Sequence, residues 1–161
     1  IIALIFTALI RTLIGLVPAI MLTAPLFGVS ILNLGFPLLL LFLSLYIFGI
    51  TLGLFVSAGL IRFGPSFENI AWSSLFLLAP LGCIYYPIEI LPNFFQIIAK
   101  GLPLVYIFDE TRNILLNGFI DYKNLKQAYF LNLIYLTFGI GLFYYSFLKA
   151  RIKGTLINMG E

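Results

Sequence analysis

Between residues 12 and 61 the chain carries no charged side chain and reads TLIGLVPAIMLTAPLFGVSILNLGFPLLLLFLSLYIFGITLGLFVSAGLI. A single helix over these 50 residues would be about 75 Å long, whereas the hydrocarbon core of a bilayer is ~30 Å thick. The run must therefore fold back, and the sequence NLGFP at 33–37 has the residue types of a turn. The pattern predicts two membrane-spanning helices, near 13–32 and 37–60.

Two further uncharged runs are each long enough to cross a bilayer. The first covers 20 residues at 69–88, after a short polar hinge between Arg62 and Glu68, and the second covers 22 residues at 127–148. A helix of about 20 apolar residues spans the hydrocarbon core. The sequence therefore predicts an all-α, polytopic membrane helix bundle with four transmembrane helices.

Composition supports a membrane protein and excludes several kinds of chemistry. Of 161 residues, 62% are hydrophobic and 9% charged, and the mean hydropathy is +1.13, whereas soluble domains carry about 25% charged residues. No histidine is present, and Cys83 is the single cysteine, so imidazole catalysis and metal clusters are not expected. We predict that the chain is not an enzyme, holds no metal, and has the lipid bilayer rather than nucleic acid as its surroundings.

Basic residues near the ends of the spans predict the orientation of the chain. Lys149, Arg151 and Lys153 follow the last span, and such residues favour the cytoplasmic side. The C-terminus and the hinge at 62–68 are then inside, and residues 89–126 are outside. The first ten residues are apolar and lack both a starting Met and the features of a signal peptide. We expect that the chain is part of a longer protein whose N-terminal helices are missing.

The outer segment contains two short helix patterns, at 91–101 and 104–117. Pro92 suits a first helical turn, and Gly101 and Gly118 suit helix ends. In the second pattern Leu104, Phe108, Thr111 and Leu115 share the expected apolar face, with Asp109, Arg112 and Asn113 opposite. Neither helix can span a bilayer. They form either a re-entrant hairpin or a pair lying at the outer interface.

Charged groups next to the spans are candidate functional residues, because ionisable groups are costly near a bilayer. In the outer segment these are Glu89 and the cluster Asp109-Glu110-Thr111-Arg112, although an Asp109–Arg112 ion pair could simply hold the hairpin. Arg62 and Glu68 are either solvated anchors or residues that face a cytoplasmic partner or line the inner entrance. Pro80 and Gly82 should kink or unwind the third span.

Small residues on the second span suggest a close helix contact. Gly49, Gly53 and Ser57 recur every four residues, and such residues let helix backbones approach closely in lipid. The contact could lie within the bundle or between subunits.

Together these features resemble the C-terminal half of type-2 ABC transporter permeases, the membrane subunits of export systems. The resemblance covers nearly the whole chain and is most specific between Tyr86 and Arg112. It rests on these sequence fragments: Arg62-Phe63-Gly64, Glu68, Ala71-Trp72, Pro80, Tyr85-Tyr86-Pro87, Leu91-Pro92, Leu102-Pro103, Phe108-Asp109-Glu110-Thr111-Arg112, Gly118 and Lys149-Ala150-Arg151-Ile152-Lys153-Gly154-Thr155-Leu156. Asp109 departs from the family pattern, which usually has Glu at this position.

The resemblance implies a fold, a function and partners. The chain would supply the last four of six helices of a permease in the cell membrane. Two such subunits, expected to be a homodimer, would enclose an export pathway for a polysaccharide, lipid or drug-like substrate. A separate cytoplasmic ABC ATPase subunit would bind ATP, so this chain would hold no cofactor. The outer helix pair would close the pathway, with gate support from Tyr85, Tyr86, Pro87, Glu89, Asp109 and Arg112. The alternative is a membrane-embedded assembly or scaffold protein without transport activity.

Overall fold

A computed structural model describes residues 2–27, 35–118 and 120–153, and every regular element in these ranges is a helix. The chain divides into two compact units, residues 1–42 and 43–161, with the boundary inside the second long helix. The first unit contains α1 (Ile2–Phe27), with Pro18 and Pro25 inside the helix. The second unit contains most of α2 and all later elements, and it carries the candidate site.

Three helices in the described part of the chain are long and apolar enough to cross a membrane. They are α1, α2 (Phe36–Phe63) and α6 (Tyr122–Lys153). These helices cover the described parts of the predicted spans 13–32, 37–60 and 127–148, and α1 extends back to residue 2. Residues 28–34, which include the first two of the five residues of the predicted turn at 33–37, lie outside the described residues. The chain is thus an all-helical protein compatible with a membrane location.

The third apolar run forms a shorter helix than the sequence predicts. α3 (Phe67–Leu81) ends seven residues before the predicted end of the span at 88. Pro80 cannot continue the helical hydrogen bonding, and Cys83 has a positive φ of 53°, which ends any helical course. The 15 residues of α3 correspond to about 22 Å of helix. The predicted unwinding at Pro80 and Gly82 is therefore confirmed, and it occurs at the helix end.

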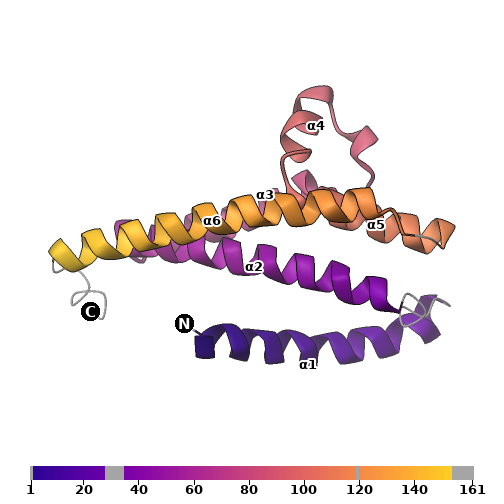
Figure 1. Cartoon of the computed structure of the whole chain (residues 1–161), viewed down its shortest axis with the longest axis horizontal. Helices are drawn as coiled ribbons and strands as arrows, with labels where there is room; N and C mark the ends of the chain where they lie inside the picture. Colours follow the sequence, from indigo (N-terminus) through magenta and orange to yellow (C-terminus); the bar gives the residue numbers. More distant parts are fainter. Residues whose placement is uncertain (1, 28–34, 119, 154–161) are drawn as a thin grey trace. The chain divides into compact units, whose positions relative to one another are not determined.

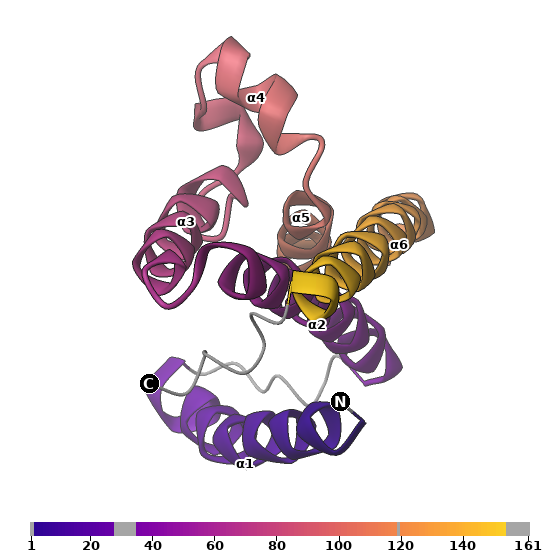
Figure 2. The ribbon, with the colours of Figure 1, turned by 90° about the vertical axis from the view of Figure 1, so that its left-hand side faces the viewer.

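The chain then makes an excursion from the long helices before returning to them. It passes through a 3-10 turn, η2 (Ile88–Ile90), and the short helix α4 (Asn93–Ala99), and comes back as α5 (Pro103–Asn117). Figures 1 and 2 show α4 at the far point of this excursion. Gly118 has a left-handed φ of 75° at the end of α5, as its position after the helix pattern predicts. We call residues 82–102 the hairpin segment.

Helices α2 and α6 run side by side in the same direction (Figure 1). The side chain of Asn132 on α6 contacts Ser44 on α2, and Gly139 lies against Thr51. Both pairs are separated by the same 88 positions in sequence, which requires parallel helices. Residues at every seventh position of α2 and of α6 thus form one line of contact between the two helices, as in a left-handed coiled coil. We call this line of contact the seam. Its buried members are small or polar: Ser44, Thr51 and Ala58 on α2, and Asn132, Gly139 and Ser146 on α6.

The glycines that the sequence singled out on α2 are not part of this seam. Gly49 and Gly53 are exposed, and no described atom lies within 4 Å of a Cβ built on either. Neither glycine therefore makes a close contact with the described residues of its own unit, and a contact of these glycines elsewhere in the bundle or between subunits stays a prediction. The face of α2 that contacts α6 is instead the one that carries Ser44 and Thr51.

The core of the excursion is small and lies between its helices. Cys83, Ala99 and Val105 are buried together, and Tyr86, Ile88, Leu91 and Leu102 pack around them. Cys83 thus packs as a small buried side chain in the turn that follows α3. By contrast, Phe94 and Ile97 of α4 are 68% and 75% exposed, so the described residues around α4 leave much of its apolar surface uncovered.

The buried face of α5 differs from the predicted one. The expected face contained Leu104, Phe108, Thr111 and Leu115, but Phe108 and Thr111 are only half-buried and Leu115 is exposed. The buried residues of α5 are Pro103, Leu104, Val105, Ile107, Glu110 and Ile114. The helix is thus turned by about one residue, roughly 100°, and this rotation brings a carboxyl group into the contact with α6.

Candidate functional site

The hairpin segment is held by side chains that hydrogen-bond to its backbone carbonyl groups. Five carbonyl oxygens in or next to the segment accept such bonds, at 2.8–3.1 Å. The donors come from the segment itself, from α5 and from α6. The bonds run from Tyr86 to Pro80, from Arg112 to Cys83, from Gln96 to Leu91, from Tyr106 to Lys100 and from Tyr135 to Gly101.

These bonds add to the turn bonds of the segment, and the Pro80 carbonyl accepts the Cys83 N–H as well. An unpaired carbonyl costs free energy when it is removed from water, and lipid offers it no partner. The side-chain donors are therefore compatible with an apolar setting for the hairpin segment.

Two tyrosines hold the C-terminal end of the hairpin segment in place. The Tyr106 hydroxyl donates to the Lys100 carbonyl at 2.9 Å and accepts a bond of 3.1 Å from the Gln127 amide. Burial raises the pKa of the Tyr106 phenol above its ordinary value, so the hydroxyl keeps its proton and remains a donor. Tyr135 of α6 donates to the next carbonyl, that of Gly101, at 3.1 Å. The end of the hairpin segment is thus joined to both α5 and α6.

Arg112 joins α5 to the end of α3. Its Nη1 donates to the carbonyl oxygen of Cys83 at 2.9 Å, and its Nη2 lies 3.8 Å from Oδ1 of Asp109. The predicted Asp109–Arg112 ion pair therefore forms, but the Asp109 side chain is 48% exposed, and exposed pairs of this kind contribute little. The bond to the Cys83 carbonyl is the stronger constraint. It gives a hydrogen-bond partner to a backbone oxygen that lies beyond the end of α3 and therefore has no helical partner.

Glu110 belongs to the charged cluster that the sequence singled out at 109–112, but it was not among the predicted gate residues. Its side chain has no exposed surface. Its Oε1 accepts a bond of 2.6 Å from the backbone N–H of Asp121, and its Oε2 accepts one of 3.2 Å from the Asn124 amide. Asp121 directly precedes α6, and its Oδ1 accepts the N–H of Lys123 at 2.8 Å.

Glu110 therefore supplies from α5 a capping interaction at the start of α6. In a capping box, a Glu within the first turn of a helix accepts the N–H of the cap residue. Here the neighbouring helix provides that carboxyl group, and the dipole of α6 favours an acidic side chain at this end. The α5–α6 turn is thus closed by a buried polar contact.

Next to this contact lies a hollow of about 780 Å³. Its lining combines carboxyl groups, a guanidinium, amides and apolar side chains: Pro87, Asp109, Arg112, Asn113, Leu116, Ile120, Asp121 and Asn124. Three of the predicted gate residues, Pro87, Asp109 and Arg112, therefore lie together. A ligand that carries a polar group on an apolar part would match this combination of polar and apolar side chains. No cluster of metal-ligating residues occurs in the described ranges.

The other predicted site residues lie apart from the hollow. Tyr86 packs on the small core and holds the Pro80 carbonyl, which is a structural role. Tyr85 is 81% exposed, and Glu89 is exposed in η2. Arg62 and Glu68 are both exposed on either side of the turn after α2.

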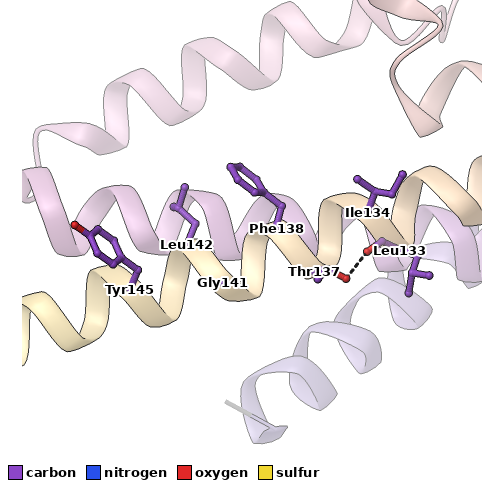
Figure 3. A pocket seen from close by; sticks show the side chains of 7 residues that line it. All are labelled: Leu133, Ile134, Thr137, Phe138, Gly141, Leu142 and Tyr145. Carbon is purple, nitrogen blue, oxygen red and sulfur yellow. Dashed lines mark hydrogen bonds between the residues drawn. The ribbon is translucent and has the colours of Figure 1, made fainter.

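A second hollow, of about 690 Å³, lies on α6 alone (Figure 3). Gly141 has no side chain and leaves the space between its larger neighbours on the helix. The Thr137 hydroxyl donates its hydrogen to the Leu133 carbonyl at 2.8 Å, so it could only accept a hydrogen bond from a ligand. The remaining lining residues are Ile134, Phe138, Leu142 and Tyr145. This surface offers apolar contact and no reactive chemistry.

The fold and the site define an all-helical protein with three helices suited to a membrane and a hairpin segment fastened by side chains. Comparison with protein-family models, curated proteins and solved structures finds no match for the chain.

Proposed function

We propose that this chain is the membrane-spanning permease subunit of an ATP-driven ABC export system for a polysaccharide, lipid or drug-like substrate. The observation that carries the proposal is the hairpin segment, whose released carbonyls are bonded by side chains of α4, α5 and α6. A segment built in this way suits the outer end of a transport pathway, where non-helical backbone must be shielded from lipid.

The parallel course of α2 and α6 supports four crossings. If both helices cross the membrane in the same direction, the chain must cross back once between residues 64 and 121. The helix α3 covers about 22 Å, which is less than the ~30 Å of a hydrocarbon core, so the turns at 82–87 would lie at the outer boundary of the membrane. In this proposal α3 is the third crossing, and the hairpin segment and the hollow lie on the outer side.

The gate is then supported by the contacts around the hollow. Arg112 fixes the end of α3, and Glu110 fixes the start of α6. Asp109 and Pro87 line the hollow between these anchors. Tyr85 and Glu89, which are exposed, could meet the second permease subunit across the pathway. ATP binds to a separate cytoplasmic ATPase subunit, and the C-terminus of this chain faces the cytoplasm of the cell.

The direct test uses the full-length protein together with its ABC ATPase. The complex is reconstituted in proteoliposomes, and three probes are offered: a fluorescent phospholipid, a cationic amphiphilic dye and a fluorescent oligosaccharide. We expect ATP-dependent, vanadate-sensitive movement of at least one probe. A stable complex with the ATPase that moves none of the three would favour the scaffold alternative, and failure to bind any ABC ATPase would contradict the proposal.

A matched pair of variants links transport to the hairpin segment. We expect Arg112→Ala to lower the transport rate at least fivefold while the ATPase remains bound. The control is Lys123→Ala, which removes an exposed basic residue at the start of α6 and should leave transport unchanged. Equal rates in both variants would exclude Arg112 from the gate.

A further inference from the structure

The C-terminal ends of α2 and α6 form a strongly basic end of the helix pair. The seam between the helices pairs positions that differ by 88, so Arg62 on α2 lies level with Ala150 on α6. Lys149 and Arg151 flank Ala150 in sequence, and both are exposed, as is Arg62. Two helices that are far apart in sequence thus bring three exposed basic side chains to one level. We call Arg62, Lys149 and Arg151 the basic end.

The two ends of this part of the chain differ in charge. Near the basic end there are four basic residues, with Lys153 as the fourth, and Glu68 is the one acidic residue among the described positions. Around the hairpin segment and the start of α6, four basic residues are matched by four acidic ones: Lys100, Arg112, Lys123 and Lys126 against Glu89, Asp109, Glu110 and Asp121. The excess positive charge therefore belongs to one end alone.

Aromatic rings support the basic side chains at this end. The guanidinium of Arg62 lies 5.5 Å from the centre of the Phe63 ring, and Nζ of Lys149 lies 5.8 Å from that of Tyr145. These distances fit cation–π contacts. Basic residues beside aromatic rings at the end of apolar helices have the arrangement found where a membrane meets water. Their alkyl stems can follow the apolar surface while the charged groups reach the headgroups.

We propose that the basic end is a binding surface for the anionic headgroups of phospholipids. The phosphate oxygens of such lipids accept hydrogen bonds from guanidinium and ammonium groups, and anionic lipids attract basic residues next to membrane helices. A lipid is favoured over an acidic protein because the three residues directly continue apolar helices whose other surfaces already require lipid. The proposal requires α2 and α6 to span a membrane, but it does not require export activity.

The test measures lipid preference with phosphatidylglycerol as the anionic probe and phosphatidylcholine as the neutral one. Wild-type protein is purified in mixed lipid–detergent micelles, and the bound lipids are counted by native mass spectrometry. We expect enrichment of phosphatidylglycerol over phosphatidylcholine. In R62Q/K149Q/R151Q this enrichment should fall at least fivefold, because each basic residue near an anionic surface contributes about a fivefold preference.

Two control variants separate the site from net charge and from misfolding. K100Q/K123Q/K126Q removes three exposed basic residues from the other end and should keep the enrichment. R62K/K149R/R151K keeps the charge and should also keep it. Equal loss in both glutamine variants, or no loss in either, would overturn the proposal. It would also be overturned if R62Q/K149Q/R151Q kept its lipid preference but lost binding to the ABC ATPase, since the occupant would then be a protein.

Discussion

The α2–α6 pair and the hairpin segment satisfy their backbone polar groups in different ways. In the pair, each helix bonds its own backbone, and the helices meet through small buried residues such as Ala58 and Gly139. In the hairpin segment, carbonyls released from helical bonding depend on single side chains from other elements, above all Arg112 and Tyr135. The first region is stabilised by close approach and the second by individual polar contacts.

This difference predicts how each region responds to substitution. A helix pair that depends on close approach should tolerate the loss of one polar group but not added bulk at the seam. A segment that depends on particular donors should be damaged by the loss of any one of them, because a buried polar group is then left without a partner. The four predictions below test this contrast.

The largest effect is expected at Glu110. Glu110→Ala removes a buried carboxyl that accepts the Asp121 N–H and the Asn124 amide, and it should lower the free energy of unfolding by about 3 kcal/mol. Unfolding of the purified protein in mixed micelles, followed by circular dichroism, measures this change. The control is Glu89→Ala, which alters an exposed side chain and should cost less than about 0.5 kcal/mol. Similar losses in the two variants would show that the buried contact is not stabilising.

The second effect concerns Arg112 and its neighbour Asp109. Arg112→Met keeps much of the side-chain length but removes the bond to the Cys83 carbonyl, so a loss of about 2 kcal/mol is expected. Asp109→Asn weakens only the ion pair at 3.8 Å and should cost less than about 1 kcal/mol. The same unfolding measurement applies to both. A larger loss for Asp109→Asn would mean that the ion pair, rather than the carbonyl bond, holds α5 to α3.

The third prediction tests whether bulk separates the α2–α6 pair. A Cβ on Gly139 would lie 3.5 Å from Cγ2 of Thr51, so the larger side chain of Gly139→Leu should force the helices apart at a cost of about 1.5 kcal/mol. Gly49→Leu adds the same bulk where no described atom lies within 4 Å, and it should have little effect on unfolding. Equal effects at the two glycines would contradict the seam.

The smallest effect is expected for the polar contact within the seam. The Asn132 amide donates to the carbonyl and to Oγ of Ser44, both at 2.9 Å. A double-mutant cycle of Ser44→Ala and Asn132→Ala should give a coupling free energy of about 0.6 kcal/mol, the usual size for polar contacts between membrane helices. A coupling above about 2 kcal/mol would make this part of the pair resemble the hairpin segment, and the contrast would fail.

Much of this architecture could be predicted from where charges and helix-breaking residues fall. The uncharged runs gave the positions of α2 and α6, because a long apolar run without charge forms a helix when it is removed from water. Pro92, Gly101 and Gly118 marked the limits of the short helices, since proline and glycine act locally on the backbone. The Asp109–Arg112 pair followed from i, i+3 spacing on one helix.

The remaining features depend on contacts between elements that no local pattern encodes. The burial of Glu110 was missed because hydrophobic spacing placed the buried face of α5 through Phe108 and Thr111, and the actual face is rotated by about one residue. The bond from Arg112 to Cys83 joins positions 29 apart. Ser44 and Asn132 each begin a seven-residue repeat of small or polar residues, but the match between the two repeats becomes visible only when α2 and α6 are aligned in parallel.

The side of the membrane on which three positions lie tests the central claim most directly. Single cysteines at Ser66, Asn93 and Ile152, all exposed positions, are labelled in intact cells with a membrane-impermeant maleimide. The wild-type protein, whose one cysteine is buried, gives the background. If α3 crosses the membrane, positions 66 and 152 will be labelled only after the cells are opened, and position 93 will be labelled from outside. If positions 66 and 93 are labelled from the same side and 152 from the other, α3 does not cross, and the four-crossing account is wrong.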